Sequence, residues 1–187
     1  MAAPASPLTQ PNSPPALRAA TSPGRAAEDS GRYRLHVVAT DIADLVTSIG
    51  GLIFDRAMAG WNVTVAVDGD RGGAIDDRPI RILGARVATT AAGPDCAGSP
   101  SRPHVLAVAT DVFVANEHLR RLVLATRKGN ATDVLLWGRR HPPKLNCRFV
   151  PVRHRPSAAA HVFKSHAMAA RGAFAAEPTE EGFYSIG

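Results

Sequence analysis

The chain has 187 residues, a formal net charge of +6 and an aromatic content of 5%. This length is enough for one globular domain with its own core. The sequence has no apolar run of about 20 residues, as a membrane helix needs, and no secretory signal with about 7–15 unbroken apolar residues. Cys96 and Cys147 have neither metal-ligand nor disulfide spacing. We therefore expect a cytoplasmic protein.

Composition divides the chain into three parts. Residues 1–30 are rich in Pro, Ala and Ser and have few large apolar side chains, so they cannot offset the entropy cost of ordering. We expect them to form a disordered leader. Residues 31–156 are expected to form an α/β domain, and residues 157–187 a C-terminal helix and tail.

The sequence Val-Ala-Thr-Asp occurs twice, at 38–41 and 108–111, and each copy ends an apolar run that leads into a helix-like segment. The same offset of 70 residues aligns further apolar positions, such as Ile49 with Leu119 and Ile53 with Val123. Such self-similarity indicates a structural repeat. We predict two similar βαβ halves, over residues 33–88 and 104–138.

The first half begins with a predicted strand over 33–40. Asp41 is placed to cap a helix whose apolar residues recur near a 3.6-residue period until Gly60. Within it, Gly50 and Gly51 each cost about 1 kcal/mol relative to Ala, which predicts close packing of the helix on the sheet.

Apolar periodicity and turn residues also predict the remaining elements. In chain order we predict a strand at 63–67, an acidic loop at 68–73, weaker strands at 80–83 and 85–88, a loop at 89–103, a strand at 105–110, a helix from Asn116 to Lys128, strands at 133–137 and 147–152, a helix from Ser157 to Ala170, and an acidic tail at 177–187.

Strands that alternate with helices favour parallel pairing with right-handed crossovers. The fold class we predict is therefore α/β, an open Rossmann- or flavodoxin-like sheet built from the two βαβ halves. In such sheets ligands bind beyond the carboxyl ends of the strands.

Acidic residues follow several of these strand ends. Their carboxylates could hold Mg²⁺ and support a divalent-metal-dependent enzyme acting on phosphate esters; they are Asp41, Asp68, Asp70 and Asp111. The alternative is structural. Asp41 and Asp111 could cap their helices, while Asp68 and Asp70 suit a glycine-rich turn. A dinucleotide fingerprint is excluded, because the stretch 40–44 has no glycine.

One local pattern resembles a known family. Gly50-Gly51, then Gly60, the strand 63–65 and Asp68-Gly69 look like the start of the zinc-dependent N-acetylglucosaminyl deacetylases of the PIG-L/LmbE type. The resemblance covers about a fifth of the chain and implies a His-Pro-Asp-Asp motif at residues 41–44. Here only Asp44 matches a ligand of that motif. Asp41 replaces the His and Ala43 replaces the catalytic base, which removes the implied zinc site.

Basic residues are concentrated in the second half. Between His118 and Ala176 there are twelve Arg and Lys residues against Asp133 alone, so this segment carries +11 and the remainder −5. Such a field attracts anions. The predicted anion-binding residues are Arg139, Arg140, His141, Lys144, Arg148, Arg153 and Arg155, with Trp137 or Phe149 as possible stacking platforms. Nineteen arginines against three lysines could instead reflect coding bias.

Three functions follow from these patterns. We favour a non-catalytic or regulatory α/β domain that binds nucleic acid or a nucleotide through its Arg-rich second half. The alternative is the metal-dependent enzyme on phosphate esters, and the third is a scaffold that binds a protein partner or a second copy of itself. No residue is assigned as catalytic, and no cofactor beyond Mg²⁺ is indicated.

Overall fold

The computed structural model describes residues 32–68, 76–88, 103–128, 132–138, 141–142, 148–172 and 178–186. The elements in these ranges are β1 (Arg34–Ala39), α2 (Ile42–Met58), β2 (Asn62–Val67), α3 (Arg78–Ile82), β3 (Arg86–Val87), β4 (Val105–Ala109), α4 (Thr110–Ala115), α5 (Glu117–Lys128), β5 (Asp133–Trp137), β6 (Phe149–His154), α6 (Ala158–Ala169) and β7 (Glu181–Ile186).

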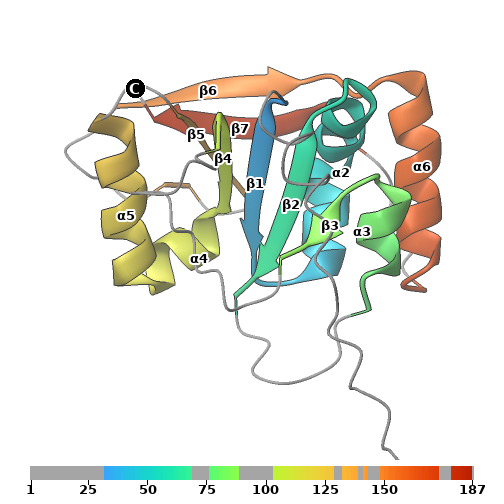
Figure 1. The fold of residues 1–187 in the computed structure, drawn as a ribbon, viewed down its shortest axis with the longest axis horizontal. Coiled ribbons are helices and arrows are strands. Elements are labelled where there is room, and N and C mark those ends of the chain that lie inside the picture. The colour runs from blue at the N-terminus through green and yellow to red at the C-terminus, as the bar shows by residue number, and fades with distance from the viewer. Residues whose placement is uncertain are drawn as a thin grey trace, which may run out of the picture.

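These strands form a seven-stranded sheet in the order β3-β2-β1-β4-β5-β7-β6 (Figure 1). The first five are parallel, and β7 is antiparallel to both β5 and β6. The predicted α/β class is confirmed. The order of the parallel strands is the doubly wound order 3-2-1-4-5, in which the chain reverses direction across the sheet between β1 and β4.

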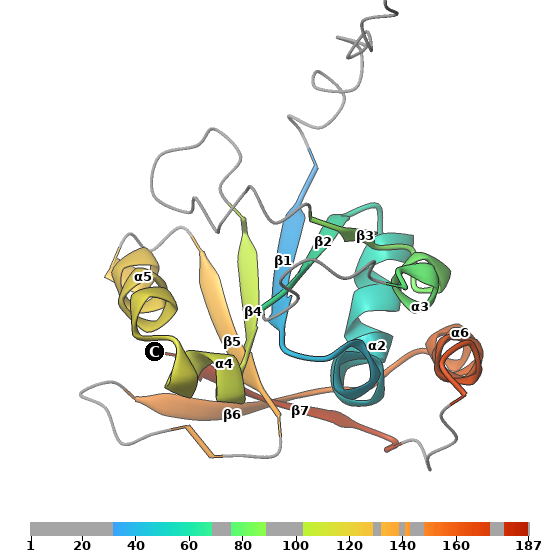
Figure 2. The same cartoon turned by 90° about the horizontal axis from the view of Figure 1, so that it is seen from below.

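Helices cover the sheet in two groups. Helices α2, α3 and α6 pack against one another, and α4 and α5 pack together on the opposite side (Figure 2). Since β1-α2-β2 and β4-α4-α5-β5 advance across the sheet in opposite directions, right-handed crossovers place their helices on opposite faces. The predicted halves, 33–88 and 104–138, contain these two units, and the second unit has an additional break between α4 and α5.

Burial explains why the strands form where they do. Strand β1 is mostly apolar and buried along its second half, while β2 alternates between buried and half-buried residues. Near-continuous apolar runs are typical of parallel strands that are covered on both faces. The central strands therefore form much of the buried core, and this core fixes the positions of their ends.

Helix α2 begins and ends as its sequence predicts. Asp41 is the N-cap, and its Oδ1 accepts a hydrogen bond of 2.9 Å from the Asp44 amide; Gly60 follows with a φ of +83°. The glycine pair does allow close packing, and its neighbours include the α6 region as well as the sheet. A Cβ on Gly51 would lie 2.6 Å from Cγ of Pro156 and 3.0 Å from Oε1 of Glu181 in β7, and one on Gly50 would lie 3.4 Å from Lys164.

The predicted strand at 80–83 is wrong, because these residues lie in and just after helix α3. Its alternating Ile and Arg residues resemble a strand, yet Ile80 and Leu83 are three residues apart and both fully buried, which is helical spacing. Pro79 at the start of the helix fits this role, since a proline there loses no intrahelical hydrogen bond. The strand predicted at 85–88 is present in shorter form as β3.

The last residues form β7, between β5 and β6, where we expected a tail. Phe183 and Ile186 of this strand are buried. A strand that pairs with partners far along the chain leaves little local signal beyond such apolar positions.

Among the described residues, no helix is long and apolar enough to cross a membrane. The leader 1–30 lies outside the described ranges.

Candidate functional site

The carboxyl ends of β1, β2 and β4 lie at one edge of the sheet, where α2 and α4 begin (Figure 1). This edge flanks the reversal between β1 and β4, the position where open α/β sheets bind ligands. We call Asp41, Asp44, Asp68 and Asp111 at this edge the rim. The amide of Asp68 donates to the carbonyl of Ala39 at 2.7 Å, so the ends of β1 and β2 are held side by side.

Asp41 has a structural role at the rim. Its Oδ1 caps α2, and its Oδ2 lies 3.6 Å from Nη2 of Arg171, which follows α6. The Asp41 side chain is 52% exposed and that of Arg171 32% exposed, so this ion pair is largely solvated and weak. The capping interpretation made from the sequence is confirmed for Asp41.

Asp44 and Asp68 are less constrained. Asp44 is half-buried in the first turn of α2, and its Oδ1 accepts a hydrogen bond of 3.3 Å from Oγ of Ser48. Asp68 is exposed, and its Oδ2 accepts a hydrogen bond of 3.4 Å from Nδ2 of Asn116. Asn116 also caps α5, because its Oδ1 accepts the Leu119 amide at 2.9 Å. One side chain thus joins the rim to the second half.

Thr110 and Asp111 are the first two residues of α4. Thr110 is buried, and its hydroxyl donates to the Trp137 carbonyl at 3.0 Å, so it is committed to β5 and not available to a ligand. Helix α4 has Ala109 at its N-cap position, which places Asp111 in the first turn rather than at the cap. Asp111 is exposed there.

A second acidic residue near Arg171 was not anticipated. Asp76 accepts hydrogen bonds from the backbone and guanidinium of Arg78 at 3.1 to 3.2 Å. These hydrogen bonds, followed by the charges of Arg78 and Arg171, hold the pKa of Asp76 below its usual range. Arg171 therefore lies within electrostatic reach of both Asp41 and Asp76, although no local sequence pattern links the end of α6 to the start of α2.

The carboxylates of the rim do not fit a metal ion by themselves. In the ranges that the structure describes, no three His, Cys, Asp or Glu side chains gather as metal ligands. Asp70 lies outside those ranges, so the predicted site of Asp41, Asp68, Asp70 and Asp111 stays a prediction.

The predicted anion-binding residues that the structure describes lie on or beside β6 and β7. Arg139, Arg140 and Lys144 are outside the described residues. Arg153 pairs with Glu180 at 2.7 Å, and Nδ1 of His141 lies 2.7 Å from the Tyr184 hydroxyl. Arg148 and Arg155 are exposed. Two of the described residues, Arg153 and His141, therefore already contact other side chains of the protein.

Neither aromatic residue offers an open stacking platform. Trp137 is 1% exposed and belongs to the core, and Phe149 is half-buried against the core.

His154, another histidine of the basic segment, bonds to Asp55 at 2.9 Å, and Ser157 donates to the same carboxylate. Burial alone would raise the pKa of Asp55, but the hydrogen bonds from Ser157 and His154 outweigh it and lower this pKa. This cluster ties the start of α6 to α2.

No protein-family model matches the chain, and no curated protein matches it significantly. Solved structures do share its fold. The A40926 pseudoaglycone deacetylase Dbv21 is 14% identical, with a TM-score of 0.56 over 83% of this chain and 97% of that one. The zinc-inhibited form of the teicoplanin deacetylase Orf2 is 10% identical, with a TM-score of 0.55 over 82% and 98%. A deacetylase–teicoplanin complex is 13% identical, with a TM-score of 0.53 over 82% and 97%.

These neighbours correct our functional expectation. We expected a non-catalytic or regulatory domain that binds nucleic acid or a nucleotide through its Arg-rich second half. That expectation is wrong, because the three solved structures compared above are deacetylases, which are hydrolytic enzymes. At these identities the likeness shows the fold alone.

Proposed function

We propose that this protein is a hydrolase that removes an acyl group from an amide nitrogen at the rim. One observation carries the proposal. The fold matches deacetylases along nearly their whole length, and in this fold carboxylates follow the strand ends that flank the reversal of strand order. That position is where open α/β sheets bind their ligands.

Amide hydrolysis needs a base for the attacking water and a donor for the developing oxyanion. Asp41 is occupied as a cap and ion-pair partner, so we assign the base to Asp44 or Asp68. The guanidinium of Arg171, which contacts Asp41, and the amide of Asn116, which contacts Asp68, supply N–H donors at the rim. In this mechanism the carboxylate takes a proton from water while the water oxygen attacks the carbonyl carbon. The same proton then passes to the amide nitrogen as the carbon–nitrogen bond breaks, which gives a carboxylic acid and a free amine.

Charge favours an acyl amide over a phosphate ester as the substrate. A neutral amide meets no repulsion from the rim, whereas a phosphate would approach several carboxylates of its own sign. A phosphate substrate would need a bound cation to offset this repulsion. The phosphate-ester activity predicted from the sequence is therefore tested as a separate arm of the same assay.

The resemblance of residues 41–44 to the N-acetylglucosaminyl deacetylases indicates which substrates to test. Asp44 occupies a ligand position of the family motif, while Asp41 and Ala43 depart from it. We would incubate the purified chain with N-acetylglucosamine and with a long-chain N-acylglucosamine and measure release of the free amine. Parallel reactions would contain EDTA, Mg²⁺ or Zn²⁺, and p-nitrophenyl phosphate would report phosphate-ester hydrolysis.

We expect amine release that Asp44→Asn or Asp68→Asn lowers by about 10²-fold or more, the contribution typical of a general base. Asp133→Asn is the matched control, because Asp133 is also an exposed aspartate but lies at the opposite end of its strand. Amine release that is equal in all three variants would contradict the proposal. Hydrolysis of p-nitrophenyl phosphate alone would replace it with the phosphate-ester activity.

A further inference from the structure

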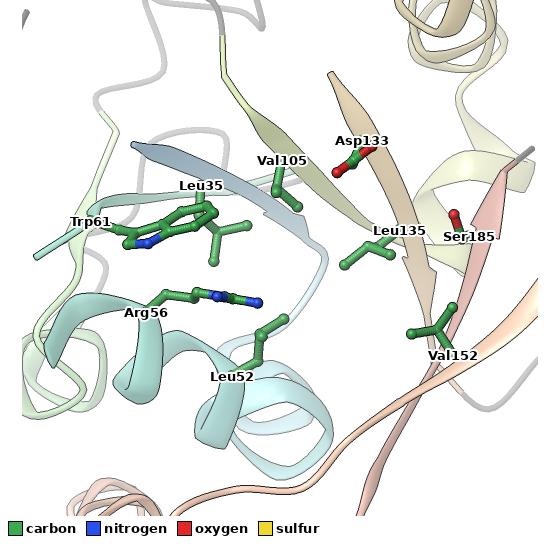
Figure 3. Close-up of a pocket in the computed structure, with 9 residues that line it drawn as sticks. All are labelled: Leu35, Leu52, Arg56, Trp61, Val105, Asp133, Leu135, Val152 and Ser185. Carbon is green, nitrogen blue, oxygen red and sulfur yellow. The ribbon is translucent and has the colours of Figure 1, made fainter. Parts of the chain in front are cut away.

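A pocket of about 320 Å³ lies at the end of the sheet opposite the rim (Figure 3). Its lining includes the amino-terminal ends of β1, β4 and β5, whereas the rim follows the carboxyl ends of β1, β2 and β4. The residues that line it are Leu35, Leu52, Arg56, Trp61, Val105, Asp133, Leu135, Val152 and Ser185. We call this the amino-end pocket. Its volume is near the lower limit for small-molecule sites in proteins.

The walls of the pocket are mostly aliphatic, with one cation and one anion. Arg56 comes from the last turn of α2, and its Cζ lies 4.7 Å from the centroid of the Trp61 ring. This cation–π contact fixes the guanidinium against an aromatic face. Figure 3 shows the guanidinium and the Asp133 carboxylate on opposite sides of the pocket, and no ion pair joins Arg56 to a described carboxylate.

The strand spacing gives the scale of the distance between these two charges. Strands β1, β4 and β5 are consecutive neighbours, and neighbouring strands lie about 4.8 Å apart. Asp133 on β5 therefore stands roughly 10 Å along the sheet from β1, next to which Arg56 lies. Leu35 on β1 and Val105 on β4 occupy the intervening floor.

From this arrangement we propose that the amino-end pocket binds a zwitterion of dipeptide size with an apolar body. The ligand carboxylate pairs with Arg56, the ligand ammonium pairs with Asp133, and the aliphatic walls cover the side chains between them. Guanidinium groups match carboxylates with two parallel hydrogen bonds. A free amino acid does not fit this arrangement, because its two charges are on the same carbon atom.

The test uses three forms of one peptide with the full-length protein. Leucyl-leucine carries both charges, its N-acetylated form lacks the ammonium, and its C-terminal amide lacks the carboxylate. Isothermal titration calorimetry measures each affinity. We expect leucyl-leucine to bind and each modified peptide to bind at least about tenfold more weakly, as expected for losing one charge-assisted hydrogen bond.

Variants assign each charge to its residue. Arg56→Gln should abolish the preference for the free carboxylate and leave the preference for the ammonium, and Asp133→Asn should do the reverse. Asp44→Asn at the rim is the control and should bind all three peptides as the wild type does. Equal binding of the three peptides, absence of binding at millimolar concentration, or an equal loss in Asp44→Asn would overturn the proposal. Thermal midpoints of the variants confirm that each is folded.

Discussion

Lys164 and Glu181 form an ion pair of 2.7 Å in which both side chains are fully buried. The two carboxylate oxygens of Glu181 also accept the backbone amides of Gly51 and Leu52, each at 2.8 Å. This one carboxylate therefore joins α6, β7 and the middle of α2. Burying two charges is costly, and such a pair persists only when its geometry is good and its remaining hydrogen-bonding capacity is satisfied.

Removing one partner should be strongly destabilising. Lys164→Met leaves the Glu181 carboxylate buried without its cation, and we expect a loss of about 3–5 kcal/mol in the free energy of unfolding. The double variant Lys164→Met/Glu181→Gln removes both charges and keeps an acceptor oxygen for one of the two α2 amides, so it should recover part of this loss. Urea denaturation measures both values. A single variant that loses less than about 1 kcal/mol would show that the pair contributes little.

Gly51 should not tolerate a side chain. A Cβ there would lie 2.6 Å from Cγ and 2.7 Å from Cβ of Pro156 and 3.0 Å from Oε1 of Glu181. Overpacking of this kind costs about 1–3 kcal/mol, and we expect Gly51→Ala to lose that amount in urea denaturation. Gly182→Ala is the matched control, because no atom lies within 4 Å of its added Cβ. Equal stability of the two variants would contradict the close packing seen here.

Much of the fold could be predicted because its signals are local. The Asp41 and Ser157 caps, the apolar run of β1 and the turn at Gly60 are each encoded within a few residues. Strand β7 could not be predicted in this way, since it forms by pairing with β5 and β6. The Lys164–Glu181 pair likewise depends on packing between distant elements.

The candidate site was only partly predictable for the same reason. Sequence reasoning placed Asp41 and Asp68 at strand ends, and the structure has them there. It did not anticipate that Arg171 would reach Asp41 or that Asn116 would reach Asp68, because those contacts span 130 and 48 residues of chain. The basic segment gave a strong signal from composition, yet charge alone does not specify where the fold places each residue.

His36 should make stability depend on pH near neutrality. Burial, and then the charge of Arg34, lower the pKa of His36 from 6.5, so the unfolded chain binds this proton at higher pH than the folded chain. The contribution is fully present above pH 6.5 and is lost as the pH falls toward the folded-state pKa.

We therefore expect urea denaturation to show a larger loss of stability between about pH 7.5 and 5.5 in the wild type than in His36→Gln. His118→Gln, which removes an exposed histidine of α5, should behave as the wild type does. The same pH dependence in wild type and His36→Gln would assign the effect to other groups.

Asp41 allows its capping role to be separated from any catalytic one. Serine is as good an N-cap as aspartate, so Asp41→Ser should keep the hydrogen bond to the Asp44 amide while removing the carboxylate and its contact with Arg171. Asp41→Ala removes both and should cost about 1 kcal/mol in urea denaturation. We expect Asp41→Ser to have near wild-type stability and to retain amine release, since the carboxylate is not the proposed base. If Asp41→Ser is stable but loses amine release as fully as Asp44→Asn, the carboxylate of Asp41 takes part in the reaction and the assignment of the base must change.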